Sequence, residues 1–197
     1  MAYVESLGVM HRDLKPSNIF MSGTSCAVIA DFGLARYCSL NENEKTPTGG
    51  MDTYIYMAPE VIVSSSYDNK CAIFSFGILL NELMDRKVPY SGSYYTIAQI
   101  AQAVADQNLR PKLCTNPPHS GESLHKNFPL LNNMVTRCWQ KDPNGRPMFR
   151  EVLKELDSIM TSLDIDDSPE SLSDENNEEG YGGNIQRRLN KFFETFL

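Results

Sequence analysis

The sequence predicts a mainly α-helical domain with a small β-hairpin near its N-terminus. Three observations support this prediction. A chain of 197 residues with 41% hydrophobic residues is long enough for one core and too short for two ordinary domains. Two short apolar runs lie near the N-terminus, and helical periodicity begins at Asp68 and continues to about Met160. We therefore expect one domain over residues 1–160.

The hairpin is predicted from two short runs of β-branched or apolar residues, 18–21 and 27–30. The Ser-Gly-Thr-Ser sequence at 22–25 separates them, as a tight connection between strands requires. Residues 34–57 then show no sustained period and include Pro47, which indicates a long irregular segment. Segments of that length are usually functional or disordered.

Four helices are predicted after this segment. Residues 68–84 are apolar on every side, which indicates a buried core helix. Three later stripes with apolar residues at i, i+3, i+4 and i+7 predict surface helices, the last of them starting at Pro147. The stripes are Ile97, Ile100, Ala101 and Val104; Leu131, Met134, Val135 and Cys138; and Phe149, Val152, Leu153 and Leu156.

The C-terminal part of the chain has a different composition. Residues 161–184 are rich in acids and poor in apolar residues, so we expect them to be disordered. Residues 185–197 are expected to form an amphipathic tail helix, which could dock onto the domain, a partner or a membrane surface, or pack weakly on its own domain. Its apolar face would consist of Ile185, Leu189, Phe192, Phe193 and Phe196.

Charge and cysteine content narrow the function classes. Eight acidic residues lie within 164–179, and the other 17 acids nearly balance the 18 bases, so we expect no nucleic-acid partner. Five widely spaced cysteines without a CxxC pair favour a reducing, cytoplasmic location. The longest apolar run, residues 71–80, is about half of the ~20 residues that a membrane span needs.

Three short motifs carry the chemistry. They are HRDLKPSN at residues 11–18, DFG at residues 31–33 and APE at residues 58–60. Each aspartate alone would indicate only a turn, but the order, spacing and context of the three motifs resemble the protein kinase family from Met1 to about Met160. The resemblance implies a protein-kinase-like C-terminal lobe that transfers phosphoryl groups from ATP to protein substrates.

The resemblance also implies a role for each site residue. Transfer of a γ-phosphoryl group spreads negative charge, so the site needs cations and alignment more than covalent chemistry. Asp13 would accept the proton of the substrate hydroxyl, and Lys15 would neutralise the γ-phosphate. Asn18 and Asp31 would hold Mg²⁺, and Phe20 would form the floor under adenine.

The group within the family is indicated by neighbouring residues. Lys15 followed by Pro16 resembles the loop of kinases specific for Ser and Thr. Cys138-Trp139 and the later Arg146 resemble the end of tyrosine-kinase-like and tyrosine kinases. The combination of the two features implies a Ser/Thr kinase of the tyrosine-kinase-like group. Three contacts are implied: Thr53 with Asp13, Arg146 with Glu60, and Phe32 with His11.

A regulatory partner is implied as well. Arg12 beside the catalytic aspartate resembles kinases that are activated by phosphorylation of the activation segment, in which an unpaired cation receives the phosphate. Thr46 and Thr48 are therefore the candidate acceptors for an upstream kinase.

The chain also departs from the family pattern. Only ten residues precede His11, so the N-terminal lobe with its glycine-rich loop, lysine and partner glutamate is expected to be absent. Ala72 stands where an aspartate usually accepts N–H groups of the catalytic loop, and Asp52 replaces a usual glycine. We expect Ser/Thr phosphorylation by the full-length kinase and none by this chain alone. The alternative is a non-catalytic kinase remnant, a pseudokinase that binds or regulates.

Overall fold

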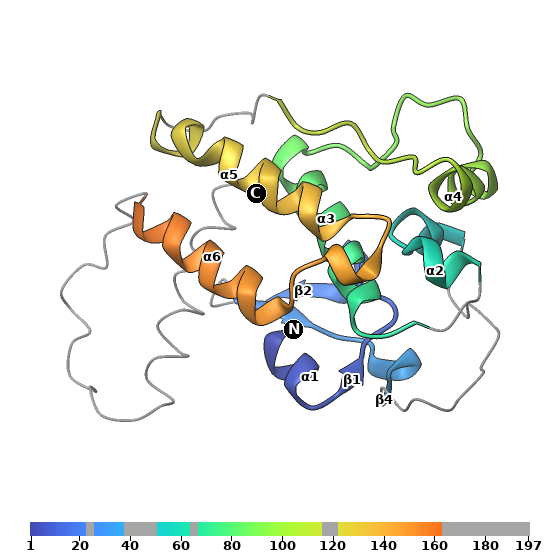
Figure 1. Cartoon of the computed structure of the whole chain (residues 1–197), viewed down its shortest axis with the longest axis horizontal. Helices are drawn as coiled ribbons and strands as arrows, with labels where there is room; N and C mark the ends of the chain where they lie inside the picture. The colour runs from blue at the N-terminus through green and yellow to red at the C-terminus, as the bar shows by residue number, and fades with distance from the viewer. Residues whose placement is uncertain (23–25, 38–50, 64–66, 116–121, 163–197) are drawn as a thin grey trace.

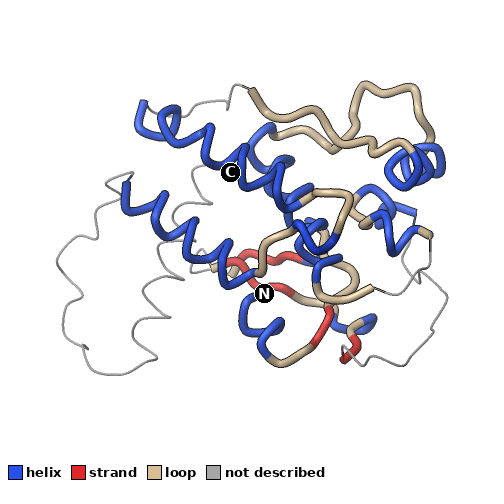
Figure 2. Tube along the Cα trace, in the orientation of Figure 1, coloured by secondary structure: helices blue, strands red, loops and turns tan. Residues whose placement is uncertain are grey.

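The computed structural model describes residues 1–22, 26–37, 51–63, 67–115 and 122–162, and of residues 51–52 and 122–126 only the backbone (Figure 1). Helices dominate the described part, as predicted, and the strands are short (Figure 2). With η for a 3-10 helix, the elements are α1 (Ala2–Ser6), β1 (Val9–Met10), η1 (Pro16–Asn18), β2 (Ile19–Met21), β3 (Ala27–Ile29), η2 (Phe32–Leu34), β4 (Arg36–Tyr37), η3 (Met51–Ile55), α2 (Pro59–Ile62), α3 (Lys70–Asp85), α4 (Ile97–Asp106), α5 (Glu122–Cys138), η4 (Pro143–Gly145) and α6 (Phe149–Ser162).

The predicted hairpin is present. β2 pairs antiparallel with β3, and the register places Phe20 opposite Val28. These two side chains share one face of the hairpin and are 58% and 48% exposed. The hairpin therefore presents an apolar cross-strand pair to the outside of the described structure.

A second pair of strands was not predicted. β1 pairs antiparallel with β4, with Val9 opposite Tyr37 and Met10 opposite Arg36. Strands of two residues are too short to show a period of two, so no pattern in the sequence predicts them. The pairing nevertheless positions the site, because it holds the chain before the HRD motif beside the chain after the DFG motif.

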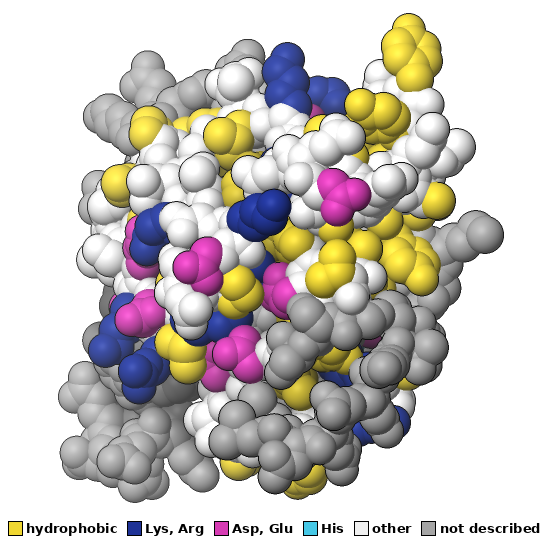
Figure 3. Space-filling model, turned by 45° about the vertical axis from the view of Figure 1, so that its right-hand side comes forward, with side chains coloured by type: hydrophobic (Ala, Val, Ile, Leu, Met, Phe, Trp, Pro, Cys, Tyr) yellow, Lys and Arg dark blue, Asp and Glu magenta, His cyan; other side chains and the backbone are white. Residues whose placement is uncertain are grey.

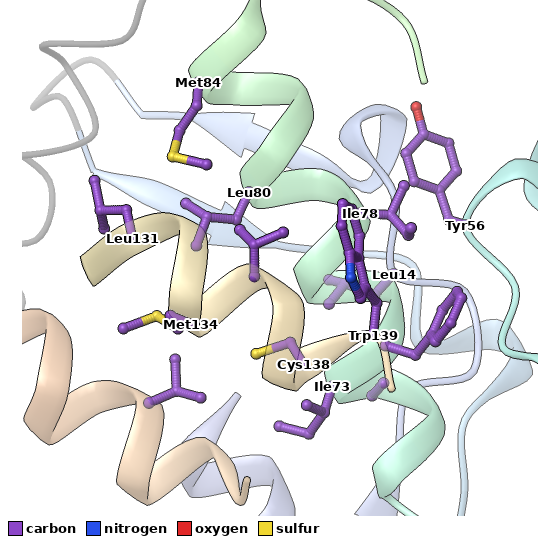
Figure 4. Packing of buried hydrophobic residues seen from close by; sticks show 14 of the residues in the cluster. Leu14, Tyr56, Ile73, Ile78, Leu80, Met84, Leu131, Met134, Cys138 and Trp139 are labelled. Carbon is purple, nitrogen blue, oxygen red and sulfur yellow. The ribbon is translucent and has the colours of Figure 1, made fainter. Parts of the chain in front are cut away.

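The core is built around α3, which confirms the prediction of a buried central helix. Ile73, Phe74, Ile78 and Leu80 on this helix are all fully buried. Figure 4 shows side chains of α3 meeting those of α5. At Gly77 a Cβ would lie 2.8 Å from the Cβ of Cys138, so the glycine permits the close approach of α3 and α5.

The three predicted apolar stripes form helices α4, α5 and α6. Their buried positions follow the predicted period, and α4 begins with a capping box between Thr96 and Gln99. α5 starts earlier than its stripe and contains Pro129. α6 begins at Phe149 rather than at Pro147, and the carboxylate of Glu5 on α1 accepts the N–H of Phe149 at 3.0 Å.

Several expectations fall outside the described residues. These are the acidic segment 161–184 beyond Ser162, the tail helix 185–197, and the acceptors Thr46 and Thr48. Among the described helices, none is long and apolar enough to cross a membrane.

Candidate active site

The site is built on the loop between β1 and β2, which runs over the fully buried side chain of His11. The Nε2 atom of His11 lies 2.9 Å from the carbonyl oxygen of Ala30 and therefore donates, since a carbonyl can only accept. Its Nδ1 atom accepts the N–H of Asp13 at 3.4 Å. The predicted contact with Phe32 is present, with an edge-on ring separation of 4.7 Å. His11 thus joins the HRD loop to the DFG segment.

Asp13 forms one cluster with three other residues that the sequence singled out, Lys15, Asn18 and Thr53. The Oγ1 of Thr53 donates to Oδ1 of Asp13 at 3.1 Å, as the resemblance implies. The Nδ2 of Asn18 donates to Oδ2 of Asp13 at 2.9 Å and to its carbonyl oxygen at 2.7 Å. Nζ of Lys15 lies 3.2 Å from Oδ2 of Asp13. Both carboxylate oxygens of Asp13 are therefore held in place.

Within this cluster only the contact between Thr53 and Asp13 was predicted, and the other contacts include one between Lys15 and Thr53. Nζ of Lys15 donates to Oγ1 of Thr53 at 2.8 Å, across 38 residues of sequence. Thr53 thus accepts from the lysine and donates to Asp13, so its hydroxyl bridges the two charges. Asp13, Lys15 and Thr53 are 6%, 9% and 4% exposed, so the two charged groups are largely removed from water. Buried charges of this kind are stable only when paired and hydrogen-bonded.

Asp31 is separate from this cluster and exposed. It adopts a left-handed backbone conformation with φ of 62°, and its Oδ1 accepts the N–H of Gly33 at 3.2 Å. The backbone N–H of Ala30 donates to the backbone carbonyl oxygen of Asn18 at 2.9 Å, which joins the chain just before β2 to the chain just after β3. No side-chain contact between Asn18 and Asp31 is found among the described residues.

The donor chemistry of these two residues fits Mg²⁺. The side-chain nitrogen Nδ2 of Asn18 donates to Asp13, so the side-chain oxygen Oδ1 of Asn18 is the atom left for a cation. Asp31 adds an exposed carboxylate. Two oxygen ligands from the protein are sufficient for Mg²⁺, which completes its shell with waters and phosphates. Within the described residues no group of three or more His, Cys, Asp and Glu side chains could hold a metal by itself.

The segment after Thr53 is anchored on the core helix by contacts that were not predicted. Ser75 Oγ donates to the carbonyl oxygen of Tyr56 at 2.8 Å, and the Tyr56 hydroxyl donates to Oε2 of Glu82 at 2.8 Å. Burial raises the pKa of Glu82, and the tyrosine hydrogen bond partly offsets this. The signal in the sequence was a polar residue, Ser75, inside the apolar run of residues 71–80.

The predicted ion pair between Arg146 and Glu60 is present and bidentate. NH1 of Arg146 lies 2.6 Å from Oε1 of Glu60, and NH2 lies 2.9 Å from Oε2. Arg146 is only 2% exposed, and its guanidinium also donates to three backbone carbonyls. This pair ties α2, at the end of the activation segment, to the helical part of the domain.

A small cavity lies beside Ala72, beneath the loop that carries Asp13. The cavity has a volume of about 20 Å³ and is lined by residues that include Arg12, Asp13, Cys71 and Ala72. A space of this size holds about one water molecule, which could satisfy backbone donors in place of a carboxylate. Cys71 does not supply an anion there, because burial raises its pKa to about 12. The side chain of Asp52 lies outside what the structure describes.

Arg12 differs from the prediction of an unpaired cation. Its guanidinium carbon lies 5.6 Å from the ring centroid of Tyr67, within the range of a cation–π contact. The residue has a φ of 70°, so the turn at the HRD motif directs its side chain toward the segment before α3. No motif predicts this contact, because the fold brings together two residues that are 55 positions apart in the sequence.

Comparison with known proteins agrees with the motifs. Residues 1–156 match the family model described as protein kinase domain. The chain is 35% identical over 167 residues to serine/threonine-protein kinase STY17 of Arabidopsis thaliana, covering 85% of this chain and 27% of that protein. It is 37% identical over 157 residues to serine/threonine/tyrosine-protein kinase HT1 of the same plant, covering 80% of this chain and 36% of that protein.

A relative outside plants gives the same result. The dual specificity protein kinase shkB of Dictyostelium discoideum is 33% identical over 163 residues, covering 81% of this chain and 23% of that protein. The chain therefore spans about a quarter to a third of the length of these relatives.

Proposed function

The chain belongs to the protein kinase family, and from that premise we propose that it carries the phosphoryl-transfer half of a Ser/Thr kinase of the tyrosine-kinase-like group. The observation that carries the proposal is the bridge made by Thr53 between Lys15 and Asp13. Thr53 is 38 residues from Lys15 and 40 residues from Asp13 in the sequence. Its hydroxyl joins the proposed base, Asp13, and the cation, Lys15, in one buried cluster. Charge alignment of this kind is what phosphoryl transfer requires.

Asp13 acts as the base in this proposal. Its two carboxylate oxygens are oriented by Thr53 and Asn18, so the side chain has one defined position. It accepts the proton of the incoming Ser or Thr hydroxyl as that oxygen attacks the γ-phosphorus of ATP. Lys15 lies 3.2 Å from Asp13 and neutralises the negative charge on the transferred group.

Asn18 and Asp31 would hold Mg²⁺ through their side-chain oxygens. When bound, the ion neutralises phosphate charge and orients the group to be transferred. Phe20 on β2 is the proposed floor under adenine, and its 58% exposure leaves its ring available to a base. Protein substrates and ATP are thus the partners that we propose for this site.

We propose that the exposed hairpin face is covered by the remainder of the kinase domain. Phe20 and Val28 share one face of the hairpin and are 58% and 48% exposed, and Phe32, which follows the hairpin, is 44% exposed. The matched region is about a quarter of the length of two of these relatives, so a longer polypeptide of this kind has room for a segment that covers the hairpin. With that face exposed, the 197-residue chain alone is expected to be inactive.

A second candidate function is a kinase remnant that binds and regulates another protein without transferring phosphate. Ala72 favours it, because this residue supplies no carboxylate beneath the catalytic loop, and a cavity of about 20 Å³ lies beside it. The intact cluster around Asp13 favours catalysis instead, and we prefer the catalytic function.

The test measures transfer of radiolabelled phosphate from ATP to myelin basic protein. The longest natural polypeptide that contains this chain is compared with its Asp13→Asn variant, and Asp85→Asn is the matched control at a surface ion pair. We expect a loss of at least about 100-fold for Asp13→Asn and no change for Asp85→Asn, since a positioned base contributes roughly 10²–10⁴. Equal rates for all three polypeptides would refute the proposed role of Asp13. The absence of transfer in all of them would favour the binding module.

A further inference from the structure

A second hollow lies outside the active site, with η3 and α2 on one side and α4 on the other. It has a volume of about 490 Å³, within the range of sites that bind ligands or side chains. One wall comes from η3 and α2 and includes Tyr54, Ile62 and Val63. Val63 is 59% exposed, so this wall presents apolar surface. Figure 3 shows hydrophobic side chains gathered on the face that carries α2 and α4.

The opposite wall is the face of α4 that is turned toward η3 and α2. Ile97 lies there with Ala98, Ala101 and Ala105, and the small side chains of the three alanines leave room in the hollow. Asp106 at the end of the helix is exposed and is the charged residue among the lining residues that the structure describes. We call this hollow the α4 groove. It suits an apolar helix that carries positive charge.

A segment of this chain has that chemistry. Residues 185–197 carry five apolar side chains at helical spacing, three of them phenylalanines, and three basic residues against one acidic residue. We propose that residues 185–197 dock in the α4 groove of the same chain. The apolar face would fill the groove, and the basic residues would lie near Asp106.

The connection is long enough for this docking. Residues 163–184 provide 22 residues between the end of α6 and the tail. Fully extended they reach about 75 Å, and as a flexible chain they span about 25 Å on average. A folded domain of this size has a radius of gyration of about 15 Å, so any point on its surface is accessible. A tether of this length gives an effective concentration near the millimolar range, so a weak contact suffices.

The position of the groove gives the docking a consequence for the site. Tyr54 lines the groove, and its neighbour Thr53 bonds to both Lys15 and Asp13. A docked tail would therefore compete with protein substrates on the activation-segment side of the cluster. This regulatory consequence rests on the proposed function, whereas the docking itself does not.

Binding is tested in the full chain. The Phe192→Asp/Phe193→Asp variant should release the tail, and a fluorescein-labelled peptide of residues 185–197 is then titrated onto it. Adding Val63→Arg should weaken peptide binding at least tenfold. Leu130→Arg is the matched control, since Leu130 is 49% exposed on α5 and outside the groove. This control should bind the peptide like the parent variant.

Three results would overturn the docking. The first is that the Val63→Arg and Leu130→Arg variants bind the peptide equally well. The second is that Phe20→Asp abolishes peptide binding whereas Val63→Arg does not. The third is that the peptide partitions into anionic vesicles and does not bind the chain. Hydrogen exchange supplies a second measurement. Releasing the tail should raise exchange in residues 97–106 severalfold, and unchanged exchange there also overturns the docking. Both measurements are independent of phosphoryl transfer, so they stand even if the proposed activity fails.

Discussion

Removing Glu60 tests how the activation segment is attached to the helical domain. Arg146 is 2% exposed, and its guanidinium donates hydrogen bonds to the carboxylate of Glu60 at 2.6 and 2.9 Å. Glu60→Gln keeps the size of the side chain but leaves the guanidinium buried without its counter-charge. Breaking a buried pair from one side costs about 3–5 kcal/mol. The backbone acceptors at Gln140, Lys70 and Lys141 remain, so we expect the lower end, about 3 kcal/mol.

The free energy of unfolding is measured by urea titration, followed through the fluorescence of Trp139. This residue is the one tryptophan of the chain and is 6% exposed, so unfolding changes its environment strongly. Glu155→Gln is the matched control, because its partner Arg137 and Glu155 itself are about one-third exposed. A pair at the surface contributes about 0–1 kcal/mol.

The result that would refute the reasoning is a loss below about 1 kcal/mol for Glu60→Gln, equal to that of the surface control. Such a result would mean that water or the backbone carbonyls satisfy Arg146 without the carboxylate. A double-mutant cycle with Arg146→Met separates the two cases, since a coupled pair gives an interaction energy of about 0.5–3 kcal/mol.

Three further predictions use single substitutions or labelling. Gly77→Ala should lower the free energy of unfolding by about 1–3 kcal/mol, because its Cβ would lie 2.8 Å from that of Cys138; an unchanged urea midpoint would contradict the close α3–α5 contact. Cys71 should resist iodoacetamide from pH 7 to 9, because burial raises its pKa to about 12 and keeps the thiol neutral; mass spectrometry should find the partly exposed Cys26 labelled before Cys71, and faster labelling of Cys71 would contradict its burial. Thr96→Ala should cost about 1 kcal/mol by removing the cap of α4, while Thr96→Ser should match the parent in the same unfolding assay.

Much of the fold could be predicted because the signals are local. The stripe at 131, 134, 135 and 138 sets one face of a helix whatever the rest of the chain does, and the structure buries all four residues. The β2–β3 hairpin likewise follows from two short runs and the turn between them. The strands β1 and β4 could not be predicted, because two residues show no period and their pairing depends on where the intervening loop leads.

The contacts of the site divide in the same way. Motifs indicated Thr53 with Asp13 and Arg146 with Glu60, although the second pair is separated by 86 residues. They did not indicate that Lys15 would bond to Thr53 or that Arg12 would lie over Tyr67. A motif records residue types at fixed offsets, whereas the partner of a long side chain depends on which groups the fold brings within its reach.

The sequence by itself determined the family, the residue types at the candidate site and the faces of the helices. It could do so because residue chemistry and helical period are carried within short segments. Only the tertiary structure decided which charges are buried together, that a cavity of about 20 Å³ lies beside Ala72, and that an apolar groove opens between α2 and α4. These features arise where distant segments pack, and packing depends on the shapes of all the contacting side chains at once.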